Sequence, residues 1–290
     1  MRRSMLFLPG NNPAMMLGGP YLGADSIIFD LEDAVSPTEK DAARILVRNA
    51  LGALEFGQVE VVVRINALDT DLWERDLEAV VPMRPSLVMP PKASDGEMIE
   101  RLAHKLDELE SRYGIEEPIG ILPLIETALG LENSFAIAKA SGRVQALFLG
   151  AEDLTADLGA IRSSEGEEIL YARCRLITAA RAAGIEAIDT PFPGVDEIEA
   201  LRRDAARARS LGFSGKAVIS PRHIEIVNRA FSPSEAEIDY AYEVMEAIEE
   251  AKRQGKGAIS LRGKMIDAPI VERARRVLEM AKQIEGGVDA

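Results

Sequence analysis

The chain has 290 residues, of which 47% are hydrophobic and 28% are charged, and its formal net charge at pH 7 is -14. This length accommodates one large α/β domain with an extension, or two small domains. The negative charge disfavours nucleic acid and anionic membranes as partners. One cysteine and two histidines are too few for an internal disulfide or a histidine-based zinc site. We therefore expect a soluble, cytoplasmic protein whose chemistry depends on carboxylates, arginine and lysine.

Short apolar runs recur along the chain, separated by segments with helical patterns. Their near-continuous apolar character is typical of strands buried on both faces. The spacing between them suits one strand, one helix and two loops. The runs are residues 4–8, 26–29, 59–65, 86–89, 119–125, 146–149, 187–188 with their flanks, and 216–219.

The segments between these runs predict helices. Residues 37–54 follow Ser36 and begin with proline, and residues 94–113 carry leucines at helical spacing. Residues 166–183 and 195–211 each end at a glycine. Eight strand–helix units predict an α/β fold, a TIM (β/α)₈ barrel. A doubly wound open sheet is the alternative, but no Gly-x-Gly-x-x-Gly follows the first strand.

The barrel pattern ends near residue 231. Two further amphipathic helices are predicted over residues 234–253 and 269–284, joined by a linker, residues 255–267, rich in glycine and lysine. We therefore predict a catalytic barrel over residues 1–231 and a C-terminal helical extension over residues 232–290. The extension would serve as a lid or as an arm for oligomerisation.

Carboxylates, one arginine and one lysine follow the predicted strands. In barrel enzymes the reacting groups lie at the C-terminal ends of the strands, so these side chains should meet at one rim. Repulsion among the carboxylates is costly unless a cation lies between them. Mg²⁺ suits this position, because it takes one or two carboxylates and leaves places for a 2-hydroxy or 2-oxo acid. The residues are Asp30, Glu32, Asp33, Arg64, Lys92, Glu126, Glu152, Asp153 and Asp189.

Simpler interpretations exist for several of these residues. Acidic residues after strands also cap helices and form turns. Arg64 can form a structural ion pair with Glu32 or Asp33. Lys92 can be the Schiff-base lysine of a metal-free aldolase, although that does not account for the surrounding acids. Asp267 immediately precedes Ala268 and Pro269, where a helix N-cap belongs.

Five segments, in the same order along the chain, resemble the citrate lyase β subunit. They are residues 3–13 (RSMLFLPGNNP), 29–35 (FDLEDAV), 64–66 (RIN), 150–153 (GAED) and 263–269 (GKMIDAP). The wider group is the HpcH/HpaI aldolase superfamily, which includes malyl-CoA and citramalyl-CoA lyases. The resemblance covers nearly the whole chain and implies a TIM barrel with a C-terminal extension, a Mg²⁺ site and a homotrimer or hexamer.

The resemblance also implies roles for individual residues. Glu126 and Asp153 would hold the metal, and Arg64 would contact the oxygen atoms of the substrate. Asp267 matches an aspartate that acts as an acid–base catalyst in the site of a neighbouring subunit. Further substrate contacts would come from Glu126, Gly150, Ala151 and Glu152. The groups surrounding the metal and Arg64 would be Asp30, Glu32, Asp33 and Lys92.

The activity implied is a Mg²⁺-dependent carbon–carbon lyase. Its substrate would be a 3-hydroxy-3-carboxyacyl thioester of the citryl-CoA or citryl-carrier-protein type, cleaved to oxaloacetate and an acetyl thioester. Mg²⁺ would stabilise the alkoxide whose collapse breaks the bond. Arg64 would stabilise developing negative charge, and Asp267 would supply a proton. The chain could belong to a citrate lyase complex.

Alternatives to a citryl thioester lyase remain at this stage. Residues 189–194 (DTPFPG) depart from the citrate lyase pattern and favour a malyl-CoA lyase type. A malyl-CoA or citramalyl-CoA lyase would release glyoxylate or pyruvate. A class II aldolase would act on free 2-oxo acids without a thioester. A non-catalytic scaffold or regulatory subunit would keep the barrel alone, but its acidic rim would then be destabilising without an ion.

Overall fold

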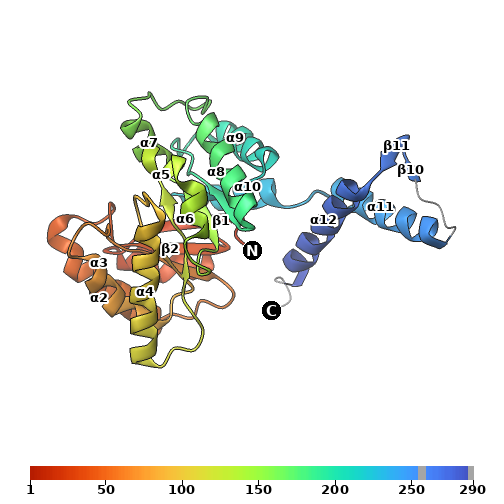
Figure 1. Cartoon of the computed structure of the whole chain (residues 1–290). Helices are drawn as coiled ribbons and strands as arrows, with labels where there is room; N and C mark the ends of the chain where they lie inside the picture. The colour runs from red at the N-terminus through yellow and green to blue at the C-terminus, as the bar shows by residue number, and fades with distance from the viewer. Residues whose placement is uncertain (254–258, 287–290) are drawn as a thin grey trace. The chain divides into compact units, whose positions relative to one another are not determined.

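The computed structural model describes residues 1–253 and 259–286 (Figure 1). The chain divides into two compact units, one of residues 2–228 and one of residues 229–290 together with Met1. This division falls within α10 (Pro221–Phe231), near the boundary predicted at residue 231. None of the helices described is both long enough and apolar enough to cross a membrane.

The larger unit contains a parallel sheet, and each of the eight predicted apolar runs contains a strand of it. The strand order is β5-β4-β3-β2-β1-β9-β8-β7-β6. The strands are β1 (Ser4–Pro9), β2 (Ser26–Asp30), β3 (Glu60–Arg64), β4 (Leu87–Met89), β5 (Gly120–Ile121), β6 (Leu124–Ile125), β7 (Ala146–Leu149), β8 (Glu186–Asp189) and β9 (Gly215–Val218).

The two ends of this order, β5 and β6, are halves of one chain segment. Leu122 and Pro123 separate them, and proline has no N–H to give to a ladder. The segment nevertheless bonds on both sides: Leu122 donates its N–H to Val88 O (2.9 Å), and Phe148 donates its N–H to Pro123 O (3.0 Å). The sheet is thus closed between β4 and β7, and the predicted eight-stranded barrel is confirmed.

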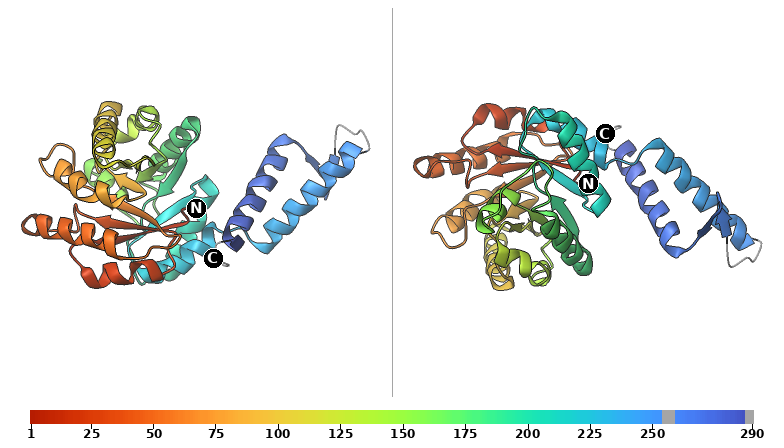
Figure 2. Two further views of the ribbon diagram at one scale, coloured as in Figure 1. Left: turned by 90° about the horizontal axis from the view of Figure 1, so that it is seen from below. Right: turned by 90° about the horizontal axis from the view of Figure 1, so that it is seen from above.

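Helices surround the strands of this unit (Figure 2). Asp95 caps α4 (Gly96–Tyr113) by accepting the Met98 N–H (2.9 Å), and Gly184 and Gly212 end α8 (Leu170–Ala183) and α9 (Ile198–Leu211) in the left-handed conformation. The elements besides α10 are α1 (Pro13–Gly18), η1 (Gly19–Tyr21), η2 (Pro37–Glu39), α2 (Lys40–Ala53), α3 (Trp73–Val80), η3 (Val81–Met83), α4 (Gly96–Tyr113), α5 (Ala128–Glu132), α6 (Ser134–Lys139), α7 (Ala151–Asp157), α8 (Leu170–Ala183) and α9 (Ile198–Leu211).

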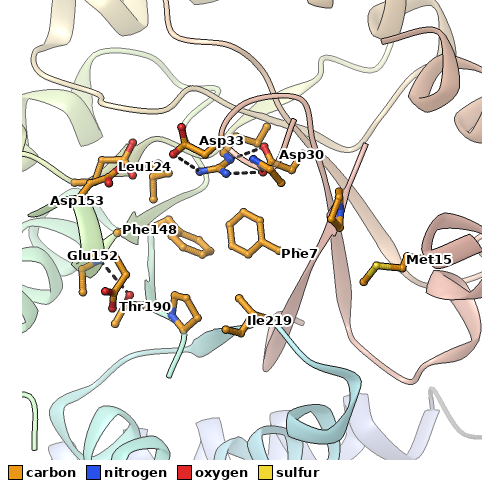
Figure 3. A pocket seen from close by; sticks show the side chains of 17 residues that line it. Phe7, Met15, Asp30, Asp33, Leu124, Phe148, Glu152, Asp153, Thr190 and Ile219 are labelled. Atoms are coloured by element: carbon orange, nitrogen blue, oxygen red, sulfur yellow. Dashed lines mark hydrogen bonds and ion pairs between the residues drawn. The ribbon is translucent and has the colours of Figure 1, made fainter. Parts of the chain in front are cut away.

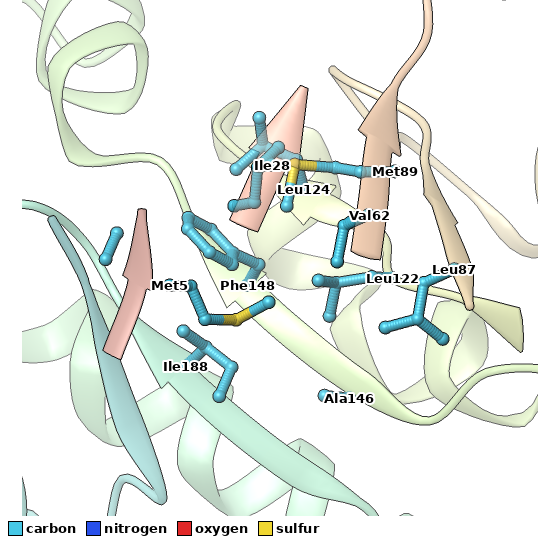
Figure 4. Packing of buried hydrophobic residues seen from close by; sticks show 11 residues of the cluster. Met5, Ile28, Val62, Leu87, Met89, Leu122, Leu124, Ala146, Phe148 and Ile188 are labelled. Atoms are coloured by element: carbon cyan, nitrogen blue, oxygen red, sulfur yellow. The ribbon is translucent and has the colours of Figure 1, made fainter. Parts of the chain in front are cut away.

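Apolar side chains fill the interior of the barrel (Figure 4). Met5, Ile28, Val62 and Phe148 come from different strands and Leu122 from the link between β5 and β6, and each is at most 1% exposed. Because alternate residues of a barrel strand point inward, each strand contributes to this core. Burial of such side chains stabilises the fold by about 1.5–3 kcal/mol each. The interior is therefore a packed plug, and any reaction must take place at a rim.

Four charged side chains form a buried cluster between β8, β9 and the helices outside them. Arg173 on α8 donates to Asp189 (3.0 and 2.8 Å) and to Asp204 (2.7 Å). Lys216 on β9 lies 2.6 Å from both carboxylates. Two cations and two anions balance, which offsets their loss of water. The prediction that Asp189 belongs to the acidic rim is wrong, because this cluster takes up its carboxylate.

The C-terminal unit consists of α11 (Glu235–Arg253) and α12 (Ala268–Gly286), which confirm the two predicted helices and lie side by side (Figure 2). Ala241, Val244 and Val271 are among the residues of their shared apolar cluster. The predicted linker is partly wrong, because β10 (Ile259–Leu261) and β11 (Lys264–Ile266) form an antiparallel hairpin. Its turn has positive φ at Arg262 (50°) and Gly263 (76°). Residues 255–258 of the predicted linker lie outside the described residues.

Replacement of Arg173 by methionine tests how much the buried cluster stabilises the barrel. The change leaves Asp189 and Asp204 with Lys216 alone, an unbalanced buried charge that should cost about 3–5 kcal/mol in the free energy of unfolding, measured by urea denaturation. The control is Arg202→Met, which removes an exposed pair with Glu199 at 3.6 Å and should cost less than about 1 kcal/mol. If both variants lost the same free energy of unfolding, the buried cluster would stabilise the barrel no more than an exposed ion pair does.

Candidate active site

A cavity of about 360 Å³ lies at the C-terminal ends of the barrel strands (Figure 3). One part of its lining is acidic and the other is apolar. Eight of the predicted site residues line it: Asp30, Asp33, Arg64, Glu126, Gly150, Ala151, Glu152 and Asp153. The remaining lining residues are Phe7, Pro9, Met15, Ala34, Leu124, Phe148, Thr190, Pro191 and Ile219.

Arg64 is fixed at the end of β3 by acidic residues of the neighbouring segment. The parallel register pairs it with Asp30, whose carboxylate accepts from Nε (2.7 Å) and Nη2 (2.5 Å). Glu32 lies 3.1 Å from Nη1, and the guanidinium also lies over the ring of Phe7, 5.2 Å from its centroid. Burial opposes the charge of Arg64, but bonding to Asp30 outweighs it and raises its pKa. Arg64 is thus a permanent, oriented cation. The predicted ion pair with Glu32 is confirmed, but the main partner is Asp30, which was not predicted.

Glu126 is the buried carboxylate of the site, with 3% of its surface exposed. Its Oε1 accepts the backbone N–H of Lys92 at 2.8 Å. Burial raises the pKa of Glu126 to about 8; the Lys92 N–H opposes the rise and the charge of Asp153 adds to it. The nearby charge of Arg64 favours the ionised form of Glu126, but it does not outweigh the effect of burial.

Gly150 gives Glu126 its space. A Cβ atom built at Gly150 would lie 2.7 Å from the Cβ of Glu126 and 2.8 Å from its Oε2. Neither distance is compatible with an ordinary side-chain contact, so any larger residue would displace the carboxylate. The predicted role of Gly150 in binding the substrate stays a prediction. The structure gives Gly150 a second role, which is to leave space for the Glu126 carboxylate.

Asp153 and Glu152 lie in the first turn of α7, where the helix dipole favours negative charge. Glu152 is well exposed and pairs with Arg162 at 3.0 Å. Asp153 makes no side-chain hydrogen bond within the described part of the chain, although its charge acts on Glu126. Asp153 is thus available to a ligand in the cavity.

Lys92 contributes to the site in two ways. Its backbone, with φ of 51°, directs the N–H to Glu126, and its Nζ lies 3.4 Å from Glu32 Oε1. Burial works against its charge, but Glu32 and Asp33 outweigh this and raise the pKa of Lys92. A Schiff-base lysine needs the neutral amine, so this environment argues against the metal-free alternative.

Asp267 belongs to the C-terminal unit and immediately precedes α12. Its Oδ1 accepts the N–H of Ile270 at 3.2 Å, which confirms the capping role. The side chain is exposed and lines a cavity within its own unit, together with Lys252 and Arg275. Its predicted acid–base role stays a prediction.

The carboxylates of the cavity fit a metal that also needs ligands from elsewhere. Within the described residues, no group of three or more histidine, cysteine, aspartate or glutamate side chains is arranged to hold an ion. Glu126 and Asp153 both line the cavity and supply two carboxylates, and the negative charge of Asp153 acts on Glu126. Mg²⁺ typically keeps several waters and binds through one or two carboxylates and its substrate, so the pair suits it.

Sequence reasoning missed the apolar part of the cavity and Thr190. Phe7 and Phe148, whose rings meet edge to face with centroids 5.9 Å apart, lie between the acidic residues and Ile219 (Figure 3). Each lies within a predicted strand. An apolar residue in a strand predicts burial in the core, and nothing in the sequence shows that it also lines a cavity. Only the barrel geometry shows that these strands end at the cavity.

The chain matches one protein family and several known proteins along most of its length. The HpcH/HpaI aldolase/citrate lyase family matches residues 3–221. The chain is 45% identical to citrate lyase subunit beta of Leuconostoc mesenteroides subsp. cremoris, over 97% of this chain and 93% of that protein. It is 34% identical to human mitochondrial citramalyl-CoA lyase, over 98% of this chain and 86% of that protein.

Among solved structures, the protein is similar to CitE from Mycobacterium tuberculosis in complex with magnesium, acetoacetate and coenzyme A. The TM-score is 0.80 at 31% identity, with 97% of this chain and 98% of that chain covered. Because the family matches most of the barrel and relatives align along nearly the whole chain, the chain belongs to the HpcH/HpaI aldolase/citrate lyase family.

Proposed function

We propose that the protein is a Mg²⁺-dependent carbon–carbon lyase that cleaves a citryl thioester to oxaloacetate and an acetyl thioester. The observation that carries this proposal is the placement of Glu126 and Asp153 beside a fixed Arg64 in one cavity. The 45% identity to a citrate lyase β subunit supports the substrate, and the magnesium bound by the similar CitE structure supports the metal.

Glu126 and Asp153 would hold Mg²⁺, which would act as a Lewis acid on the carboxylate and hydroxyl oxygens of the substrate. Arg64 carries five N–H donors; Asp30 accepts the Nε proton and one from Nη2, and Glu32 lies 3.1 Å from Nη1. One donor on each of Nη1 and Nη2 would therefore remain for oxygens that gain negative charge as the bond breaks. Because Asp30 already fixes its orientation, little reorganisation is needed during the reaction.

The apolar part of the cavity would receive the acyl end of the thioester. Phe7, Phe148 and Ile219 offer no charge to it, and their surfaces exclude water from the reacting carbon. An enolate formed there by cleavage is stable only while oriented donors face its oxygen, and Arg64 lies against the ring of Phe7. The two sides of the cavity would thus bind the two products.

We further propose that Asp267 supplies or relays the proton that the enolate carbon needs, acting in the site of a neighbouring copy in a trimer or hexamer. Its exposed position at the start of α12 supports this, because a buried cap could not reach a substrate. The acyl carrier would be coenzyme A or a carrier protein, and the enzyme would work in the cytoplasm, alone or in a citrate lyase complex.

A second candidate is a citramalyl-CoA lyase, which would release pyruvate. The 34% identity to the human enzyme supports it. Residues 189–194, whose sequence favours a malyl-CoA lyase type, contribute Thr190 and Pro191 to the lining of the cavity, so this departure from the citrate lyase pattern lies at the site itself.

A panel assay tests the proposal. Citryl-CoA, malyl-CoA, citramalyl-CoA and the corresponding free acids are incubated with Mg²⁺ or with chelator, and the 2-oxo acid released is measured. We expect citryl-CoA cleavage that chelator abolishes and no turnover of free acids. Cleavage that persists in chelator would contradict the metal-dependent mechanism, and preferential cleavage of citramalyl-CoA would establish the second candidate.

The affinity for Mg²⁺ should depend on pH. Because the pKa of Glu126 is raised to about 8, the carboxyl is mostly protonated at lower pH, and Mg²⁺ must displace that proton. As the pH is raised towards about 8, the affinity measured by calorimetry should therefore increase roughly tenfold with each pH unit. Above that pH it should level off. Glu126→Gln should bind Mg²⁺ weakly without this dependence. A pH-independent affinity in the unmodified protein would exclude Glu126 as a ligand.

Two substitutions separate the roles of Asp267. Asparagine can still cap α12 but cannot transfer a proton, so Asp267→Asn should keep the melting temperature and lose roughly 100-fold or more in turnover. Alanine removes both functions and should also cost about 1 kcal/mol of stability. Full activity of Asp267→Asn would leave the residue with its capping role alone.

A further inference from the structure

The site depends on the position of α7, whose first turn carries Asp153. Asp153 makes no side-chain hydrogen bond within the described residues, so the region that its carboxylate can reach depends on where the backbone of α7 lies. The residue before this helix is Gly150, which has no side chain and cannot cap it. Gly150 cannot be exchanged for a capping residue either, because a Cβ there would meet Glu126. The beginning of α7 therefore needs a partner from another element.

Thr190 is that partner. It follows β8 directly, is fully buried, and accepts the N–H of Ala151, the first residue of α7, on its Oγ1 at 3.1 Å. At the other end of the helix, Asp157 accepts the N–H of Ala128 at 2.7 Å. Thr190 thus fixes the end nearer to Asp153, and Asp157 fixes the end away from it.

The backbone of Thr190 is fixed in turn by the buried ionic cluster. Lys216 donates from Nζ to Thr190 O at 2.7 Å and to Asp189 at 2.6 Å. Arg173 holds the same Asp189 with two hydrogen bonds. All of these side chains are fully buried, so few other conformations are open to them. A continuous series of hydrogen bonds joins Arg173 to the first turn of α7.

We propose that Thr190 is a positioning residue for the metal site: its hydroxyl holds the first turn of α7 so that Asp153 meets the cation held by Glu126. This rests on the proposed function, which assigns Mg²⁺ to these two carboxylates. Thr190 does not ligate the ion; it acts through the Ala151 N–H. The buried ionic cluster fixes the backbone of Thr190 through Lys216 and so restricts the position of its hydroxyl.

Thr190→Val tests the proposal, because valine keeps the shape and removes the acceptor. Supporting groups of this kind typically contribute 10–100-fold to metal affinity, so the dissociation constant for Mg²⁺, measured by calorimetry, should rise by about that factor. Thr190→Ser keeps the hydroxyl and should stay within about threefold of the unmodified protein. Thr190→Ala lacks the acceptor without adding bulk, and serves if the valine variant does not fold.

Thr155→Val is the matched control, since the same change is made on the same helix. Thr155 is also buried, but its hydroxyl donates to Ala151 O (2.8 Å) and Glu152 O (3.0 Å) within α7. It should leave Mg²⁺ affinity unchanged. Equal weakening by Thr155→Val and Thr190→Val would indicate general loosening of the helix and overturn the proposal.

Unaltered affinity in both Thr190→Val and Thr190→Ala would also overturn it, with the proposed function left standing. If the unmodified protein binds no Mg²⁺, the proposed function fails first and this inference fails with it. The measurement of the unmodified protein therefore distinguishes the two failures. Because metal binding is read directly, the result does not depend on the identity of the acyl substrate.

Discussion

The burial of the Glu126 carboxylate beside Asp153 is the constraint on which the rest of the site depends. Burial disfavours the charged form of the Glu126 carboxyl, and the negative charge of Asp153 adds to this effect. The cost of ionising Glu126 appears as a pKa of about 8. A divalent cation removes this cost, and the site then becomes a place where oxygen atoms of a substrate can complete the coordination.

The surrounding structure maintains this strained pair. Gly150 lacks the side chain that would displace Glu126, and Lys92 adopts a positive φ that directs its N–H to the same carboxylate. Arg64 is oriented by Asp30, and its charge partly offsets the acidic set. Close approach and an unusual backbone conformation thus both serve the Glu126 carboxylate, whereas the core of the barrel is apolar packing.

Much of the fold could be predicted from the sequence because the signals are local. Apolar runs of strand length predicted all eight strands, and parallel strands of a barrel necessarily direct their ends to one rim. This geometry placed Asp30, Arg64 and Glu126 together. The prediction failed where position depends on contacts distant in sequence. Asp189 ends a strand as the others do, but Arg173 and Lys216 take up its charge inside the wall.

Two other features had no sequence signal of this kind. The hydrogen bond from Ala151 to Thr190 joins the ends of two strands, and a threonine after a strand has many ordinary explanations. The hairpin of residues 259–266 is too short for alternation of apolar and polar residues to stand out, and its glycine was interpreted as part of a linker. The resemblance to citrate lyase subunits added the choice of Glu126 and Asp153 from a larger acidic set, which strand-end geometry alone does not make.

The most direct test of the account is a crystal structure of the protein soaked with Mn²⁺, which can replace Mg²⁺ at oxygen-rich sites and is visible by anomalous scattering. The account predicts one strong anomalous peak within coordinating distance of the Glu126 and Asp153 carboxylates, with the remaining positions open to water or oxaloacetate. A peak at other residues, or none in the cavity at saturating Mn²⁺, would contradict it.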